Sequence, residues 1–304
     1  MKKIGKTQGR ISPLPYKTFQ LMEAAKAEFE MRYGNLDGLP ADLLGLSQSV
    51  EVCWSHSSHV ATRYRLTEAL AVSVAADFDP ADPMDFVTLV NKGWITPVAS
   101  PVIDIREMKQ RARDCFRDIG FSGVATIEFD LLLRPKNDRE GHLILPHIHA
   151  VGHIDTHRAK KTIGELKMSS RLVQPWGCPT VVRKKVNTVE DLMHVLAYPL
   201  KLPVRTKRLV PNKRKAGEWK MRTNSRRQVH ALARIVEVLS YCRHKDLLFT
   251  IGGKNRWLTN ACSTLSRRGQ SREAWYSDAE LKTIWMNVHA GNRFASFGEL
   301  IIRK

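Results

Sequence analysis

His147 and His149 are the two side chains in this sequence whose type and spacing most directly suggest metal chemistry. They lie in an apolar, partly β-branched run at residues 143–151, bounded by Gly141 and Gly152, and this pattern predicts a buried or half-buried strand. Side chains two residues apart in a strand point to the same face, so both imidazoles could bind one divalent ion. Because such pairs are more often structural and hydrogen-bonded, the hypothesis needs a third ligand and a reactive group.

The segment before this strand predicts its partner. Residues 123–133 have the composition of a strand, and residues 134–141 form a polar stretch that contains Pro, Asn, Asp and Gly. The two strands are therefore expected to form an antiparallel hairpin with its turn centred near Asp138 and Arg139.

This hairpin supplies two candidate carboxylates. The expected register places Glu128 opposite His149 and Asp130 opposite His147, all on one face of the sheet. Two imidazoles and one carboxylate leave coordination positions open for water or a phosphate oxygen. This donor set favours Mg²⁺ or Mn²⁺ acting as a Lewis acid over a closed structural zinc site.

Other potential metal ligands would lie on the same face of the sheet as the two histidines. If the strand continues, His153 or His157 could join the metal site, and Asp130 could replace Glu128. Gly152 instead favours a bend, which would leave His153 and His157 at the end of the sheet, near solvent or DNA phosphates.

A candidate nucleophile, Tyr198, lies farther along the chain. Thr188 is a good N-cap followed by acidic residues, so a helix is expected to begin there and to bend or end at Pro199. Helical spacing puts His194, Tyr198 and Lys201 on one face. A phenol can attack phosphorus when a metal polarises the phosphate and a cation stabilises the developing charge. Taken singly, each residue has an ordinary packing or solvent role.

Three motifs occur in an order that resembles the HUH endonucleases, specifically the rolling-circle replication initiator (Rep) proteins of bacterial plasmids and phages with one catalytic tyrosine. Residues 86–90 look like the first family motif, a strand of the form Phe-x-Thr-Leu. Residues 146–149, Pro-His-Ile-His, look like the second, and residues 198–201, Tyr-Pro-Leu-Lys, look like the third. The similarity covers about residues 83–203, and the ordered set is more specific than any one motif.

The resemblance implies a role for each candidate residue. His147, His149 and Glu128 would hold Mg²⁺ or Mn²⁺, since Glu128 lies where such proteins carry an acidic ligand, which favours it over the other carboxylate of its strand. Tyr198 would attack the scissile phosphate and leave a free 3′-hydroxyl and a 5′-phosphotyrosine. Lys201 would position the tyrosine or the phosphate.

The activity implied by the resemblance is metal-dependent nicking and strand transfer on single-stranded DNA, at the start and end of rolling-circle replication. The expected partners are single-stranded DNA or an origin hairpin, with a host helicase as a further candidate. Transposases and mobilisation relaxases share the chemistry, although in relaxases the tyrosine usually precedes the histidines. A catalytically inactive DNA-binding protein of the same fold is the alternative from another class.

The order of the predicted elements indicates an α+β fold. From residue 83 it runs β-α-β-β-(α)-β-α, which predicts an antiparallel sheet with helices packed on one face. The resemblance implies the same HUH/Rep-like, ferredoxin-like core, with metal and tyrosine on the open face. The predicted regions are a mainly helical extension at 1–82, the endonuclease core at 83–203, and a basic linker with an α-rich DNA-binding or accessory region at 204–304.

The charge of the chain points to a polyanionic partner. Lys and Arg number 49 against 30 Asp and Glu, a net charge of +19 that is more typical of proteins that bind nucleic acid than of proteins that bind anionic membrane. The charged residues between 205 and 227 are all cationic except Glu218, and the segment contains Trp219. This basic ribbon could follow a phosphate backbone while the indole stacks on a base, or it could be a disordered, solvated linker.

Cysteine use and hydropathy predict a cytoplasmic protein. The five cysteines are widely spaced, and no Cys-x-x-Cys pair occurs. Cys53, His56 and His59 have metal-ligand types at short range, but they lack a fourth ligand nearby and match no standard zinc finger. Because no signal peptide and no apolar stretch of about 18 residues occurs, no membrane interaction is expected.

Overall fold

Strands and helices are interspersed along the computed structural model, which describes residues 16–45, 56–134, 141–176, 178–197, 206–211, 219–224, 229–253, 255–268, 276–291 and 298–304. The strands are β1 (Met84–Val90), β2 (Thr96–Pro97), β3 (Val102–Asp104), β4 (Phe121–Leu133), β5 (Leu143–Ile154), β6 (Val181–Val186), β7 (Thr206–Pro211), β8 (Trp219–Asn224), β9 (Leu248–Ile251) and β10 (Ile301–Arg303). The helices are α1 (Tyr16–Tyr33), α2 (Ala41–Leu44), α3 (Val60–Ala75), the 3-10 turn η1 (Lys92–Trp94), α4 (Ile105–Asp118), α5 (Ile163–Lys167), α6 (Val189–Ala197), α7 (Val229–Tyr241), α8 (His244–Leu247), α9 (Asn255–Arg268) and α10 (Asp278–Gly291).

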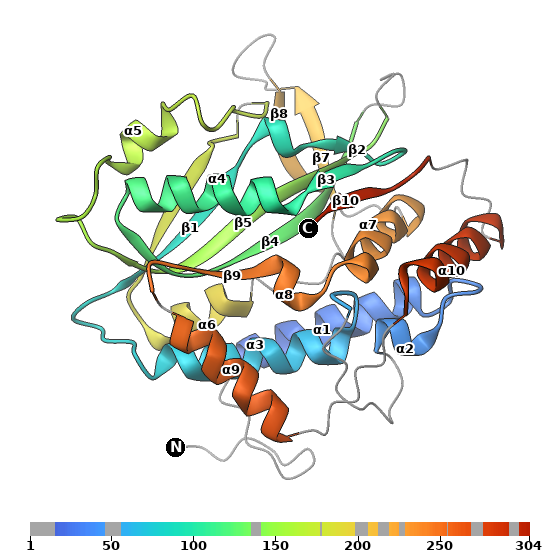
Figure 1. Ribbon diagram of the computed structural model, residues 1–304, viewed down its shortest axis with the longest axis horizontal. Helices are drawn as coiled ribbons and strands as arrows, with labels where there is room; N and C mark the ends of the chain where they lie inside the picture. The colour runs from blue at the N-terminus through green and yellow to red at the C-terminus, as the bar shows by residue number, and fades with distance from the viewer. Residues whose placement is uncertain are drawn as a thin grey trace.

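A large, mostly antiparallel sheet forms the centre of the molecule (Figure 1). Among the described residues it has eight strands, with β6-β1-β5-β4-β7-β8 in line, β2 paired to β5 and β9 paired to β4. The β4–β7 pair is parallel, and β3 and β10 form a separate parallel pair. The predicted mixture of antiparallel sheet and flanking helices is thus confirmed.

The hairpin of β4 and β5 is confirmed, but its predicted register is wrong by two residues. Glu128 lies opposite His147, and Asp130 lies opposite Leu145. His149 pairs with Thr126. An even shift preserves the side-chain parity, so the carboxylates and imidazoles still share one face.

The sequence suggests a bend at Gly152, but β5 does not bend there. The strand continues to Ile154, and Gly152 pairs with Gly123 of β4. A Cβ atom on Gly152 would lie 2.0 Å from the carbonyl oxygen of Ser122, and one on Gly123 would lie 2.1 Å from that of Val151. The two glycines therefore permit a close approach of the two strands.

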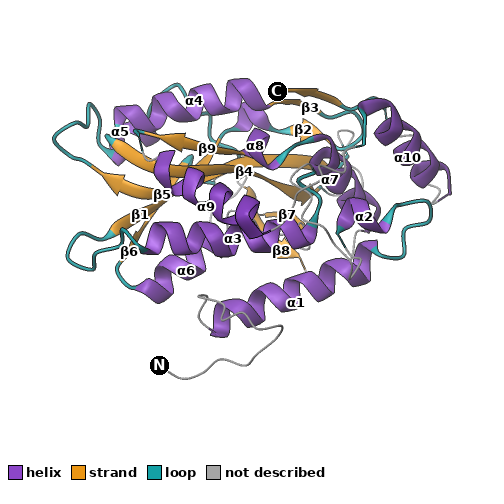
Figure 2. Cartoon of the chain, turned by 60° about the horizontal axis from the view of Figure 1, so that its bottom comes forward, coloured by secondary structure: helices purple, strands orange, loops and turns teal. Residues whose placement is uncertain are grey.

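Helices cover both faces of the sheet, so the prediction of helices on one face is wrong (Figure 2). Apolar residues of α4, such as Met108 and Phe116, pack with Ile127 and Ile148 in one cluster. On the other face, residues of α3, α6 and α9 pack with Val124 and other strand residues. The predicted open face, which carries Glu128 and the two histidines, is covered because the N- and C-terminal segments fold back onto it.

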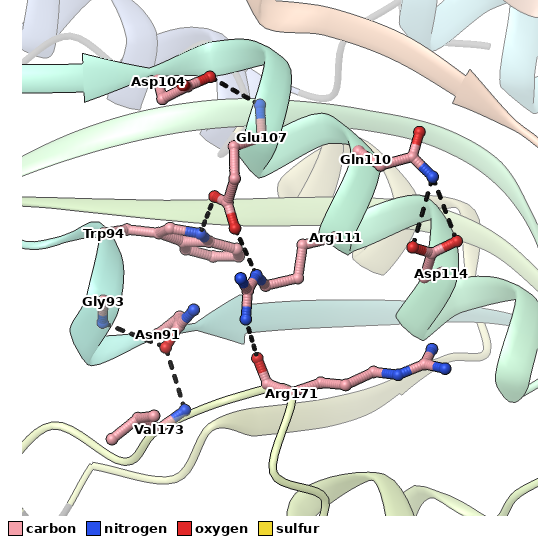
Figure 3. Close-up of polar contacts among 10 residues, drawn as sticks. All are labelled: Asn91, Gly93, Trp94, Asp104, Glu107, Gln110, Arg111, Asp114, Arg171 and Val173. Atoms are coloured by element: carbon pink, nitrogen blue, oxygen red, sulfur yellow. Dashed lines mark hydrogen bonds and ion pairs between the residues drawn. The ribbon is translucent and has the colours of Figure 1, made fainter.

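Polar contacts fix α4 against the sheet (Figure 3). Asp104 caps the helix by accepting a hydrogen bond from the backbone N–H of Glu107 at 2.8 Å. The Glu107 carboxylate accepts from the indole N–H of Trp94 at 2.9 Å and from Arg111, which also donates to the carbonyl of Arg171 at 2.8 Å. These contacts join α4, η1 and the segment before β6 on the face opposite the histidines.

The C-terminal segment adds a strand to the sheet as well as covering it. β9 pairs with residues 123–126 of β4, and β10 pairs with β3. The division at residues 83 and 204 stays a prediction. Within the described ranges, no helix combines the length and apolar character needed to cross a bilayer.

Two histidines of the weak zinc candidate have structural roles. His56 Nδ1 is 2.6 Å from the carbonyl oxygen of Ser240. His59 caps α3, because its Nδ1 accepts a hydrogen bond from the backbone N–H of Thr62 at 3.2 Å. Cys53 lies outside the described residues. Burial is the main factor that lowers the pKa of His59 to about 4, and it also lowers the pKa of His56.

We expect the free energy of unfolding to fall as the pH is lowered from 7 to 5. His59 has a pKa of about 4 in the folded protein against 6.5 as a model value, so the unfolded chain binds more protons in this range. The contribution of neutral His59 to the free energy of unfolding is complete above about pH 6.5. It is lost as the pH falls to about 4, and the total loss is about 3 kcal/mol. Urea unfolding at several pH values measures the slope. His59→Asn keeps a capping oxygen and removes the titration, so its slope should be flatter; an unchanged slope would contradict this assignment.

Candidate metal centre

Glu128, His147 and His149 form a compact group of potential metal ligands. One ligand atom from each residue lies within 4.8 Å of the others. The Oε2 atom of Glu128 is 3.5 Å from Nε2 of His147 and 3.6 Å from Nε2 of His149. All three residues are buried, with exposed fractions of 4–8%. The adjacent strands β4 and β5 therefore bring the three predicted ligands together.

The second nitrogen of each imidazole has its own polar contact. His147 Nδ1 is 3.2 Å from the carbonyl oxygen of Leu145, and His149 Nδ1 is 2.8 Å from the hydroxyl oxygen of Thr88. Because a carbonyl only accepts, the His147 contact requires a proton on Nδ1, so Nε2 is the nitrogen whose lone pair would bind a metal. Phe86 stacks on His149 at 5.1 Å between ring centroids. Such outer contacts orient metal-binding histidines in proteins.

The donor set fits a divalent cation. The two Oε2–Nε2 distances are longer than hydrogen bonds, and Glu128 Oε1 is buried without a hydrogen-bond partner in the described part of the chain. Donors about 2.1 Å from one ion and about 90–110° apart would lie about 3.0–3.4 Å from each other, close to the two distances between Glu128 Oε2 and the imidazole nitrogens. A cation would also compensate the cost of burying the Glu128 carboxylate.

Asp130 lies at the edge of this group and has a different partner. Its Oδ2 atom is 3.8 Å from Nε2 of His147 but 2.6 Å from Nζ of Lys207 in β7. The ammonium group balances the charge of Asp130, whereas Glu128 faces both imidazoles. The geometry therefore favours Glu128 as the third ligand.

His153 and His157 are not part of the group. His153 Nδ1 lies 3.4 Å from a carboxylate oxygen of Asp82. His157 is exposed, and its backbone N–H donates to Asp155 at 3.0 Å. Their shared parity with His147 does not bring them to the same point, because His153 lies six residues farther along β5 and His157 lies beyond the end of the strand at Ile154.

A cavity of about 560 Å³ adjoins the triad. His147, His149, Asp130 and Lys207 line its polar side, and residues of α1, α3 and α6 close it from the opposite side. Arg63 of α3 also lines it; burial lowers the pKa of Arg63 to about 10, and the charge of Glu128 opposes that shift. At neutral pH the guanidinium stays protonated, so the cavity contains a cation that the sequence did not single out.

The helix that leads to the candidate nucleophile passes along this cavity. The hydroxyl of Thr188 accepts a hydrogen bond from the backbone N–H of Asp191 at 3.1 Å, which confirms the predicted cap. His194 and Ala197 line the cavity. Tyr198 and Lys201 lie outside the described residues, so their predicted roles stay predictions.

The first two motifs meet in the sheet. β1, which contains residues 86–90, pairs with β5, and Thr88 faces His149 directly. The hydroxyl–imidazole contact between these two residues gives the first motif a physical link to the second. No protein-family model, no curated protein and no solved structure matches this chain.

Proposed function

We propose that this protein is a metal-dependent endonuclease and strand transferase that nicks single-stranded DNA, as a rolling-circle replication initiator does. The observation that carries the proposal is the buried triad of Glu128, His147 and His149 beside a cavity with cationic side chains. A net charge of +19 supports a polyanionic substrate.

The donor set suits phosphodiester chemistry. Three protein ligands leave positions for a phosphate oxygen and water, and Mg²⁺ or Mn²⁺ bound there would supply Lewis-acid polarisation of the phosphate. Arg63 and Lys207 both line the cavity and can stabilise the negative charge of a bound phosphate group. The same ligand set serves non-haem Fe(II) oxygenases, but a strongly basic chain favours an anionic substrate.

Tyr198 would perform the covalent step. Its phenol oxygen forms a bond to phosphorus while the bond from phosphorus to the 3′ oxygen breaks. The phenol proton is lost, and the leaving oxygen takes up a proton to become a free 3′-hydroxyl. The 5′ end stays on the tyrosine, and attack by a 3′-hydroxyl can reverse the step and join strands. Lys201 would position the tyrosine or the phosphate.

Related activities share this chemistry. A transposase or a mobilisation relaxase would use the same triad and the same tyrosine. A DNA-binding protein without catalysis would retain the basic surface and lose the need for a metal.

Two isosteric variants on β4 test the proposal. We expect Glu128→Gln to lose both Mn²⁺ binding and nicking of single-stranded DNA from the element that encodes the protein, because the amide cannot supply a charged ligand. Asp130→Asn is the matched control, since Asp130 pairs with Lys207, and it should retain Mn²⁺ affinity. Calorimetric titration with Mn²⁺ and a gel assay of nicking provide the two readouts. Mn²⁺ affinity lost in Asp130→Asn and kept in Glu128→Gln would overturn the ligand assignment; no nicking by the intact protein would support the inactive DNA-binding protein.

A further inference from the structure

β7 and β8 form an antiparallel hairpin at one end of the sheet, within the basic ribbon of residues 205–227. This arrangement excludes the disordered-linker interpretation for residues 206–211 and 219–224. β7 also pairs in parallel with β4, where Lys207 lies beside Leu132. Because β4 carries Glu128, the hairpin is fixed relative to the candidate metal centre (Figure 1).

The inner face of the hairpin leads away from the cavity. Lys207 lies closest to the triad, with Nζ 2.6 Å from Asp130, and the next pair on this face is Leu209 and Met221. Met221 lines the cavity. Trp219 shares the face of Met221, because the two are two residues apart in one strand, and 39% of it is exposed. The ammonium group of Lys207, an apolar pair of side chains and the exposed indole of Trp219 thus follow one another over about 13 Å along the hairpin.

The outer face carries charges that lack compensation. Arg208 pairs directly with Arg222, and Lys220 pairs with Val210. Both arginines are exposed, and no described carboxylate forms an ion pair with Arg208, Lys220 or Arg222. Like charges directly opposite each other destabilise a pair of strands. The Arg208–Arg222 pair therefore destabilises this edge of the sheet unless an anion compensates the two charges.

The cations at the opposite edge of the sheet, on β6, do have carboxylate partners. On β6, Arg183 and Lys185 both contact the buried Asp85, at 2.6 and 3.2 Å, and Lys184 contacts Asp191 at 2.8 Å. Each of the three consecutive cations of β6 thus has a carboxylate partner within the protein. On the β7–β8 hairpin, by contrast, Lys207 pairs with Asp130, and the three cations of the outer face are left for an external anion.

We propose that the β7–β8 hairpin is a binding arm for a single nucleic-acid strand. Trp219 stacks on an unpaired base outside the cavity, and Lys207 contacts a phosphate beside the triad. Arg208, Lys220 and Arg222, on the outer face, contact phosphates farther along the strand, where it passes around the edge strand β8. The direction of the strand toward the cavity rests on the proposed function, whereas strand binding by the hairpin does not.

The composition of the hairpin favours a nucleic-acid strand over a lipid surface. A membrane-binding face combines its cations with several exposed apolar side chains that enter the bilayer. Among the described residues of the hairpin, the only large apolar side chain that is more than about a third exposed is Trp219. One aromatic among cations matches base stacking along a phosphate backbone.

Equilibrium binding of a labelled thymidine oligonucleotide in EDTA tests the arm without metal or cleavage. Arg208→Ser/Arg222→Ser should lower the slope of log affinity against log salt by about 1.4, since each phosphate contact on a single strand contributes about 0.7. The control Lys160→Ser/Lys282→Ser removes the same charge from exposed sites on other elements and should change the slope far less. Trp219→Ala should weaken binding about 5- to 150-fold, and Trp219→Phe should keep most of the affinity.

The outcomes separate the arm from the proposed function. An unchanged slope in the double arginine variant together with unchanged affinity in Trp219→Ala would overturn the arm, as would equal losses in the lysine control. Losses confined to duplex DNA, or to phosphatidylserine vesicles, would also overturn it by assigning the hairpin to another partner. If the hairpin variants lose strand binding but the intact protein never nicks DNA, the proposed nuclease function is wrong and the binding arm stands. If the protein nicks DNA and the hairpin variants bind the strand normally, only the binding arm is wrong.

Discussion

Mn²⁺ binding should fall by at least about 100-fold when either His147 or His149 is replaced by alanine. Loss of an outer contact to a metal ligand typically costs about 10- to 100-fold, and each substitution here removes a ligand itself. The two imidazoles contribute Nε2 atoms that lie 3.5 and 3.6 Å from the same carboxylate oxygen of Glu128, and the neighbouring carboxylate of Asp130 is paired with Lys207. Calorimetric titration with Mn²⁺ at neutral pH measures the change.

His153→Ala is the control for this prediction. His153 lies on the same strand and has the same parity, but its ring contacts Asp82 outside the triad. It should retain the affinity of the unmodified protein. Circular dichroism will show whether His147→Ala and His149→Ala remain folded. Equal affinities in all three folded variants would contradict a metal centre at this position.

Tyr198→Phe should reduce nicking by about 10⁴-fold or more while Mn²⁺ binding and single-strand binding stay unchanged. The substitution removes only the hydroxyl oxygen that would bond to phosphorus, and loss of a nucleophile has effects of this size in other enzymes that form covalent intermediates. Tyr198 directly follows Ala197, which lines the cavity together with His147 and His149. Single-turnover nicking of a labelled oligonucleotide provides the rate.

Tyr241→Phe is the matched control for the nucleophile. Tyr241 belongs to α7, and burial, with smaller contributions from nearby carboxylates, raises its pKa to about 12. Its hydroxyl is therefore a poor nucleophile, and its removal should leave the nicking rate unchanged. Full activity of Tyr198→Phe, or a matching loss in Tyr241→Phe, would remove Tyr198 from the mechanism.

The strands around the triad were predictable because side-chain parity is a local property. The alternation in residues 123–133 and 143–151 identified β4 and β5 and placed Glu128, His147 and His149 on one face. The exact pairing was not predictable, since the polar stretch between the strands allowed more than one turn centre. A shift of one residue in that centre moves the pairing by two residues and leaves the faces unchanged.

Features that depend on long-range contacts were missed. Nothing local indicated that Arg63 in a predicted helix would line the cavity with the histidines, or that Lys207 would pair with Asp130 across β4 and β7. Gly152 alone suggests a bend. Its role in the close approach of two strands depends on Gly123, and only the observed register places Gly123 opposite it. Metal-ligand types at short range do not by themselves indicate a metal site, since the ring of His56 makes a buried contact with a backbone carbonyl.

Covalent capture of DNA on the protein tests the nuclease most directly. The protein is incubated with Mn²⁺ and single-stranded DNA from its own element, labelled on the 3′ side of the nick, and the denatured mixture is digested and mapped. The mechanism predicts a labelled adduct that resists denaturant and maps to Tyr198, because attack on the phosphate leaves the 5′ end on the phenol oxygen. An adduct on a different tyrosine, or cleavage without any adduct, would contradict the tyrosine mechanism.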